Sequence, residues 1–222
     1  MENGKLRNKT IFSHGKGRNR ILFISTFFFF FVAVFCACRH QTEAVLFQVP
    51  DGLTLHSGDL VFRKGQSIES HAVTIADSGN VYSHVGIVLW TTDGWKVLHA
   101  VPNERNSHNE KDSVKLEPIG VFFRSDRSVH GAVYRLPVTG EDTLKLLRKG
   151  LMLYQRHPLF DGDFDDHDST AFYCTELVWF IYRQETGIDL SQGRRHKMPL
   201  FPPMIFCSDL LNYPKIEKIH EF

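Results

Sequence analysis

Residues 82–88 read Tyr-Ser-His-Val-Gly-Ile-Val, and residues 172–179 read Phe-Tyr-Cys-Thr-Glu-Leu-Val-Trp. The first stretch is a β-prone run that opens with a histidine, and the second places a cysteine where a helix is expected to begin. A thiol becomes a useful nucleophile only as its thiolate, which a neighbouring imidazole and the positive end of a helix both favour. The two stretches therefore predict a nucleophile at Cys174 and a general base at His84.

The segment after His84 has the pattern of a β-hairpin. Residues 85–90 and 95–101 are β-rich runs, and the residues between them include the pair Asp93-Gly94, which is typical of a tight turn. In such a hairpin His84 and His99 lie on adjacent antiparallel strands. Further β-prone runs at 58–63 and 129–136 give the predicted sheet at least four strands.

Three helices are expected from the spacing of apolar residues. The first helix covers residues 67–76. The second begins with a cap at Thr139 and places Leu144, Leu147, Leu151 and Tyr154 on one face. The third covers residues 174–187 and ends at Gly187. Residues 102–113 are polar and predict a surface loop. The tail beyond Arg194 is expected to be irregular, with one short helix around 205–211.

Composition limits the chain to one catalytic-sized domain. It has 222 residues, of which 42% are hydrophobic, and a formal net charge of +1. Residues 1–20 contain six cationic side chains against one glutamate, so about +5 of charge lies there and about −4 elsewhere. This distribution gives no indication of nucleic-acid binding, and we expect no nucleic-acid partner.

The basic start leads into an apolar run from residue 21 to residue 38, which is typical of a signal peptide or a membrane anchor. The run ends in Phe35-Cys36-Ala37-Cys38, where a small residue before a cysteine is similar to a bacterial lipoprotein cleavage box. We therefore expect lipidation at Cys38, with an uncleaved anchor or plain secretion as alternatives. The positive flank predicts a folded domain outside the cytoplasm, in the cell envelope. The expected organisation is a targeting segment at 1–38, a tether at 39–57 and a domain at 58–222.

Two cysteines, Cys174 and Cys207, remain for the folded domain. A disulfide between them is the usual expectation in an exported protein. Because Cys174 lies in a motif with catalytic character, we instead expect both to be free, with Cys207 packed as a small buried hydrophobic residue.

A run of aspartates follows the second predicted helix, at positions 161, 163, 165, 166 and 168. Alternating oxygen ligands with a glycine are compatible with calcium, but the terminal glutamate of an EF-hand loop is missing. A solvated acidic loop that braces the Cys174 helix is the favoured interpretation. Neither His157 nor His167 has a partner at zinc-site spacing, and Glu176 is expected to be structural. We expect no metal and no cofactor.

The motifs together resemble the YiiX/YebB-like group, a circularly permuted branch of the NlpC-type papain-fold cysteine peptidases and amidases. The matching pieces are Gly58-Asp59, residues 82–86, residues 97–100, Phe160-Asp161 and residues 173–179. The resemblance implies an α+β, papain-like fold in which an antiparallel sheet packs against helices.

The resemblance also implies the site. Cys174 would be the nucleophile, His84 the base, and His99 the residue that orients the imidazole. Members of this group commonly carry a glutamate where this chain has His99, and Glu104 is the alternative third residue if the strand register differs. Tyr82 is a candidate substrate-binding residue.

The expected function is that of an exported, membrane-associated cysteine hydrolase that cleaves an amide through an acyl-enzyme. The substrate would be a cell-wall peptide or an amino-acid conjugate, including a lipid-linked one, and the membrane partner would be engaged through the N-terminal segment. Two alternatives use the same residues differently. One is acyl transfer from a lipid ester, as in the lecithin retinol acyltransferase-like branch, and the other is a non-catalytic, surface-anchored binding domain.

Overall fold

The computed structural model describes residues 43–104, 111–165, 169–199 and 201–222. The chain divides into two compact units, Met1–Glu43 and Ala44–Phe222, and the fold is that of the second unit. The predicted targeting segment and the lipidation site at Cys38 lie outside the described residues. Within the described part of the chain, no helix has the length and apolar character needed to cross a membrane.

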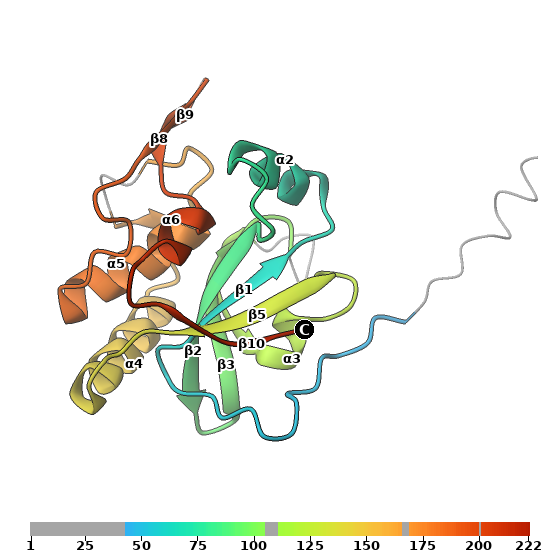
Figure 1. The fold of residues 1–222 in the computed structure, drawn as a ribbon, viewed down its shortest axis with the longest axis vertical. Coiled ribbons are helices and arrows are strands. Elements are labelled where there is room, and N and C mark those ends of the chain that lie inside the picture. The colour runs from blue at the N-terminus through green and yellow to red at the C-terminus, as the bar shows by residue number, and fades with distance from the viewer. Residues whose placement is uncertain (1–42, 105–110, 166–168, 200) are drawn as a thin grey trace, which may run out of the picture. The chain divides into compact units, whose positions relative to one another are not determined.

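A curved sheet forms the centre of the described unit (Figure 1). Its eight strands in the described residues follow the order β10-β5-β1-β2-β3-β4-β6-β7, and all neighbours are antiparallel except β6 and β7. The strands are β1 (Leu60–Lys64), β2 (His84–Thr91), β3 (Gly94–Val101), β4 (Ser113–Pro118), β5 (His130–Arg135), β6 (Leu159–Phe160), β7 (Ala171–Phe172) and β10 (Glu217–Glu221). The expected hairpin is confirmed, because β2 and β3 pair from Ile87↔Leu98 to Thr91↔Gly94.

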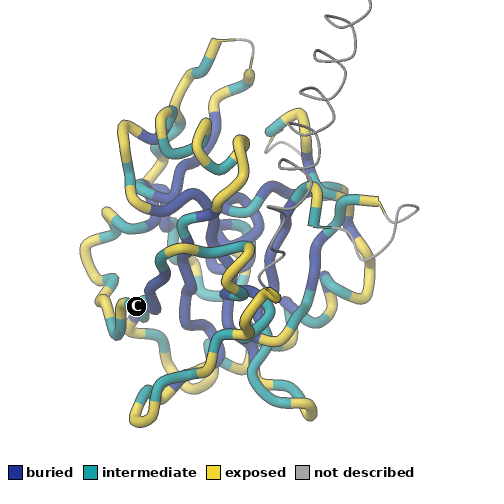
Figure 2. The backbone as a smooth tube through the Cα atoms, turned by 90° about the vertical axis from the view of Figure 1, so that its right-hand side faces the viewer, coloured by how far each residue is buried: buried dark blue, intermediate teal, exposed yellow. Residues whose placement is uncertain are grey.

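Helices cover one face of this sheet and a thinner layer covers the other. The helical layer consists of α4 (Gly140–Gln155), α5 (Cys174–Thr186) and α6 (Cys207–Leu211), and the second layer contains α3 (Ile119–Phe122) and residues near Leu55. The middle of the tube in Figure 2 is dark blue, in agreement with the burial of most of β1 and β2 and of the second half of β3. In β1, Leu60 and Phe62 pack on the helices, whereas Val61 packs on the opposite layer, as the strand period of two requires.

The predicted tether packs onto the domain. The N–H of Phe47 donates to the carbonyl of Gly120 over 3.1 Å, and Leu55 is buried. The folded unit thus begins earlier than the boundary expected at residue 58.

Local signals explain where the two long helices begin and end. The Thr139 hydroxyl accepts from the N–H of Asp142 and closes the capping box that starts α4. The Glu176 carboxylate accepts from the N–H of Tyr173 at 3.1 Å, so α5 begins at Cys174, and it ends at Gly187, whose φ of 74° only glycine adopts readily. Both helix predictions are confirmed at these ends.

The predicted helices are present, but the structure differs from the sequence interpretation in three details. The fully buried residues of α4 are Leu146, Gly150 and Leu153. Of the predicted face, Leu147, Leu151 and Tyr154 pack against the core while partly buried, whereas Leu144 is 58% exposed. Helix α2 (Ile68–Ala76) buries none of its residues. The tail is more ordered than expected, since β8 (His196–Met198) and β9 (Phe201–Met204) form a hairpin and β10 joins the sheet.

Strand β4 was also missed, because its sequence Ser-Val-Lys-Leu-Glu-Pro mixes charged residues with only two apolar ones. In the fold, Val114 packs in the core with the helices, while Lys115 and Glu117 point to the opposite face. Polar partners on that face compensate the burial of their charges. This strand brings Glu117 to the functional site.

Candidate active site

Cys174 and His84 line the same cavity, which has a volume of about 450 Å³. Cys174 is the first residue of α5, and His84 is the first residue of β2. The N–H groups of Val85 and Thr175 donate to the Cys174 sulfur. The β2–β3 pairing begins only at Ile87↔Leu98, so Val85 lies outside the paired stretch of the two strands, and its N–H is directed to the thiol. The expected nucleophile and base are therefore brought to one cavity.

A chain of hydrogen bonds leads away from His84. Its Nε2 lies 2.9 Å from Nδ1 of His99, and Nε2 of His99 lies 3.1 Å from Oε1 of Glu117. A carboxylate only accepts, so His99 carries its proton on Nε2 and accepts at Nδ1 from the Nε2–H of His84. This assignment leaves Nδ1 of His84 as the lone-pair nitrogen, which is the form a general base requires.

Glu117 was not among the residues predicted from the sequence. Arg127 Nη1 donates to both of its oxygens, at 2.9 and 3.0 Å. Burial opposes ionisation, but the hydrogen bond from His99 and the charge of Arg127 lower the pKa of Glu117 to about 2. The available signal was the alternation Val114, Lys115, Leu116, Glu117, which marks a strand next to that of His99.

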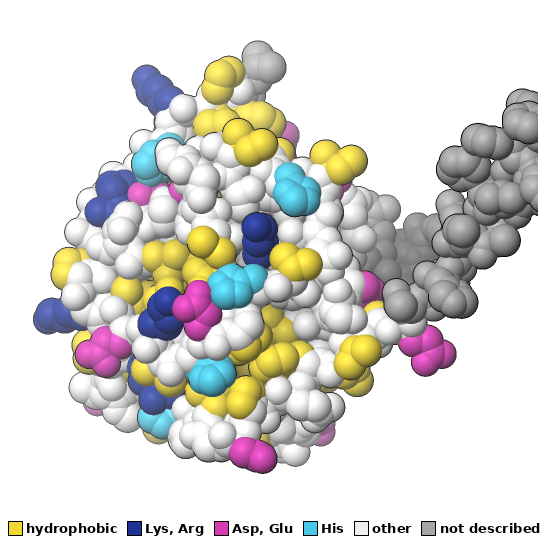
Figure 3. Space-filling view, turned by 45° about the vertical axis from the view of Figure 1, so that its right-hand side comes forward, with side chains coloured by type: hydrophobic (Ala, Val, Ile, Leu, Met, Phe, Trp, Pro, Cys, Tyr) yellow, Lys and Arg dark blue, Asp and Glu magenta, His cyan; other side chains and the backbone are white. Residues whose placement is uncertain are grey.

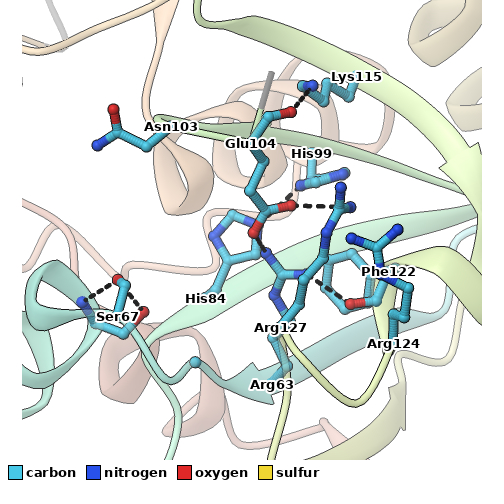
Figure 4. A network of polar contacts seen from close by, with 12 residues as sticks. Arg63, Ser67, His84, His99, Asn103, Glu104, Lys115, Phe122, Arg124 and Arg127 are labelled. Atoms are coloured by element: carbon cyan, nitrogen blue, oxygen red, sulfur yellow. Dashed lines mark hydrogen bonds and ion pairs between the residues drawn. The ribbon is translucent and has the colours of Figure 1, made fainter. Parts of the chain in front are cut away.

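Glu104, the alternative third residue, has a different place. Its Oε1 accepts from Arg63, and its Oε2 makes an ion pair with Arg127 Nη1 at 3.0 Å (Figure 4). Arg63 is the direct strand partner of His84 and also donates to the Phe122 carbonyl at 2.5 Å. Glu104 thus neutralises the buried Arg63 beside the predicted base, His84. The hydrogen bond to the ring of His84 is made by His99 and not by Glu104.

The ring of Phe122 packs against the side chains of His84, His99 and Arg63. Its centroid lies 5.6 Å from that of His84 and 5.0 Å from that of His99, and the Arg63 guanidinium lies over it at 4.6 Å. Phe122 is fully buried, so it fixes these side chains in one arrangement.

Burial makes the thiol and the imidazole neutral at rest. It raises the pKa of the Cys174 thiol to about 11, although the backbone donors and the charge of Arg63 act in the opposite direction. Burial, with the charge of Arg63 and the neighbouring His99, lowers the pKa of His84 well below its usual value. Burial also lowers the pKa of His99, against the pull of Glu117. The favourable effect expected from the helix end is outweighed by desolvation.

Tyr82 lies outside the cavity lining. It is 4% exposed, its ring stacks on His130 with centroids 5.6 Å apart, and its hydroxyl donates to Glu221 at 3.1 Å. The structure therefore gives Tyr82 a packing role in place of the substrate contact expected from the sequence.

The aspartate loop is organised by Asp161. Its carboxylate accepts from the N–H groups of Asp163 at 2.9 Å and Asp165 at 2.6 Å, which braces the loop itself, not the Cys174 helix. Asp166 and Asp168 lie outside the described residues. Cys174 and Cys207 are both free. On the face seen in Figure 3, acidic, basic and histidine side chains are interspersed with hydrophobic ones.

Comparison with known proteins identifies the family and the fold of the chain. Residues 54–209 match the model of a family described as permuted papain-like amidase enzyme, YaeF/YiiX, C92 family. The fold is similar to the crystal structure of metalloprotein yiiX from Escherichia coli O157:H7, with a TM-score of 0.62 and 18% identity over 77% of this chain and 99% of that chain. No curated protein matches the chain significantly. Since the family model covers well over half of the sequence, the chain belongs to the C92 family of permuted papain-like amidases.

Proposed function

We propose that this chain hydrolyses an amide through a thioester on Cys174, with His84 as general base and acid and His99 as the residue that orients it. The observation that carries the proposal is the hydrogen-bond chain from His84 through His99 to Glu117, which leaves Nδ1 of His84 unprotonated in the cavity that Cys174 lines. Membership of an amidase family favours catalysis over a non-catalytic binding domain.

The first half-reaction forms the thioester. Because the thiol is neutral at rest, its proton moves to Nδ1 of His84 as sulfur attacks the amide carbonyl carbon. The new carbon–sulfur bond gives a tetrahedral oxyanion, and the N–H groups at the start of α5 are suited to stabilise it. The carbon–nitrogen bond then breaks, and the amine leaves with the proton from His84.

The second half-reaction removes the acyl group. Water gives a proton to His84 and attacks the thioester, the carbon–sulfur bond breaks, and the thiol recovers the proton as the carboxylic acid forms. Glu117 remains an anion throughout and stabilises the positive charge that the two imidazoles share.

The cellular setting of the proposal comes from the N-terminal segment. The basic start and the apolar run at 21–38 support an exported protein held at the membrane, through lipidation at Cys38 or through the segment itself. A cell-envelope amide, from a wall peptide or an amino-acid conjugate, is then the accessible substrate class.

One observation also favours acyl transfer as a second candidate. Phe160, Phe164 and Tyr173 line the cavity beside Cys174, and such an apolar wall suits a lipid acyl group. An amine or alcohol in place of water would complete a transfer from the same thioester.

The solved relative is described as a metalloprotein, so we considered which donors of this chain are available to an ion. Both ring nitrogens of His99 are used in hydrogen bonds. Within the described ranges, no three histidine, cysteine, aspartate or glutamate side chains are close enough to share an ion. The steps above therefore use only protein groups.

The test is detection of the thioester by intact-protein mass spectrometry on the full chain, with an amide panel and added acceptors. We expect an acyl adduct on Cys174 that is absent in Cys174→Ala, and hydrolysis reduced about 10²- to 10⁴-fold in His84→Ala. Cys207→Ala is the matched control and should leave both unchanged, since Cys207 does not line the cavity. Hydrolysis that survives in Cys174→Ala would refute the proposal, and acylated acceptor would identify transfer.

A further inference from the structure

The cavity beside Cys174 has two chemically different sides, since the lining residues Arg63 and Phe160 lie on β1 and β6, which β2, β3 and β4 separate in the sheet. One is apolar and includes Phe160, Phe164, Tyr173 and Val101, and the other is charged and includes Arg63, Glu104, Arg124, Asp126 and Arg127. A substrate that fills both sides must itself have an apolar part and a polar part.

The apolar side of the cavity is formed by residues that lie next to the nucleophile, Cys174. Tyr173 directly precedes Cys174, and its ring lies 5.5 Å from that of Phe164, which in turn lies 6.1 Å from that of Phe160. Phe160 pairs with Phe172 across β6 and β7, so the backbone that leads into the Cys174 helix also carries this wall. A group bonded to the sulfur of Cys174 would therefore meet aromatic rings.

Phe164 is held in this wall by a dedicated loop. Its φ is 57°, in the left-handed region that bulky residues rarely adopt. The carboxylate of Asp161, which is 8% exposed, accepts from the N–H groups on both sides of Phe164, those of Asp163 and Asp165. The ring of Phe164 is partly buried against the core and also lines the cavity. Strain of this kind is maintained where a side chain must be presented to a ligand.

The charged side of the cavity is formed by residues that lie next to the base, His84, and its hydrogen-bonded partners. Arg63 is the strand partner of His84, and Arg127 contacts Glu117 at the end of the histidine chain. Arg124 and Asp126 form an ion pair at 2.6 Å farther out, where both are partly exposed. The leaving amine of the substrate, which receives its proton from His84, would therefore meet paired charges and hydrogen-bonding groups.

The chemistry of the proposed function fixes the direction in which an amide binds. The acyl carbon must bond to Cys174, and the leaving nitrogen must reach Nδ1 of His84 to receive its proton. We infer that the substrate is an N-acyl amide with a hydrocarbon acyl group, held by the Phe160–Phe164–Tyr173 wall, and a polar or charged amine. This inference rests on the proposed function and specifies its substrate class.

A pair of amides in which the carbonyl and the nitrogen are exchanged tests the direction in which the substrate binds. N-hexanoylglycine and N-pentylmalonamate carry the same pentyl and carboxylate parts on opposite sides of the amide, and N-acetylglycine is the short-chain reference. With the full chain in lipid nanodiscs, we expect kcat/KM for N-hexanoylglycine to exceed that for N-acetylglycine by at least about tenfold, since each buried methylene is worth about fourfold. N-pentylmalonamate should be no better than N-acetylglycine.

Variants of the wall separate this binding role from a structural one. Phe164→Ala and Asp161→Ala should reduce the hexanoyl-to-acetyl ratio to within about threefold, and Phe164→Leu should keep most of the ratio. Trp90→Ala is the matched control, because Trp90 is an exposed aromatic residue that does not line the cavity.

The possible failures are distinguishable. If hydrolysis depends on Cys174 but N-pentylmalonamate is preferred, or if acyl length has no effect, the substrate inference is overturned and the amidase function stands. If no amide is cleaved in a Cys174-dependent way and no thioester forms, the proposed function fails, and the inference fails with it.

Discussion

Replacement of Glu117 by glutamine tests whether the carboxylate at the end of the histidine chain takes part in proton transfer. The substitution keeps the size of the side chain and an oxygen that can accept from His99, but it removes a negative charge that is present at every pH above about 2. The two histidines would then carry the catalytic proton without a counter-charge.

The structure gives the size of the effect. Hydrogen bonds of 2.9 and 3.1 Å and the width of one imidazole ring separate the carboxylate from Nε2 of His84 by roughly 8 Å. At an effective dielectric constant of about 20, a unit charge at that distance stabilises the imidazolium by about 2 kcal/mol. Because about 1.4 kcal/mol is tenfold in rate, we expect kcat/KM to fall roughly 30-fold.

The assay is kcat/KM for amide hydrolysis as a function of pH. Loss of the negative charge disfavours the imidazolium, so the pKa values of both histidines decrease and the acid limb of the profile moves to lower pH as the plateau falls. Glu185→Gln is the matched control, since Glu185 pairs with Lys149 at 3.5 Å on α4 and α5 and does not line the cavity. A fall of less than threefold, or a fall with an unmoved acid limb, would show that Glu117 has only a structural role.

Three further predictions follow from burial and capping. Ultraviolet difference spectra of wild type against Cys174→Ser should show the thiolate only near pH 11, and a thiolate signal at neutral pH would mean that the resting pair is ionised. His84 and His99 have folded-state pKa values below their unfolded value of about 6.5, so their contribution to the free energy of unfolding should be complete above that pH and be lost as pH falls. Glu117 should add a second loss of stability between about pH 4.5 and 2. A denaturant midpoint that is constant from pH 7 to 3 would contradict both expectations. Thr139→Ala should lower the free energy of unfolding by about 1 kcal/mol through loss of the α4 capping box, measured by urea titration, and an unchanged midpoint would show that the box is not needed.

The elements that carry Cys174, His84 and His99 could be predicted because each depends on neighbouring residues. The Asp93-Gly94 turn places the two histidine strands side by side, and the capping and Gly187 signals fix both ends of the cysteine helix. The buried face of α4 was not predictable to the residue, since several helical faces contain leucines and only contact with the sheet selects Leu146 and Leu153.

The elements that carry Cys174, His84 and His99, the cysteine and histidine motifs and the family resemblance followed from the sequence alone, because these depend on local patterns. Only the tertiary structure placed Glu117 next to His99, since that contact depends on the pairing of β3 with β4, where His99 faces Lys115 and reaches Glu117 diagonally. It also decided the ionisation of the site. A helix end and an imidazole favour a thiolate, but burial by residues distant in sequence removes water from Cys174, and the loss of solvation exceeds those local effects.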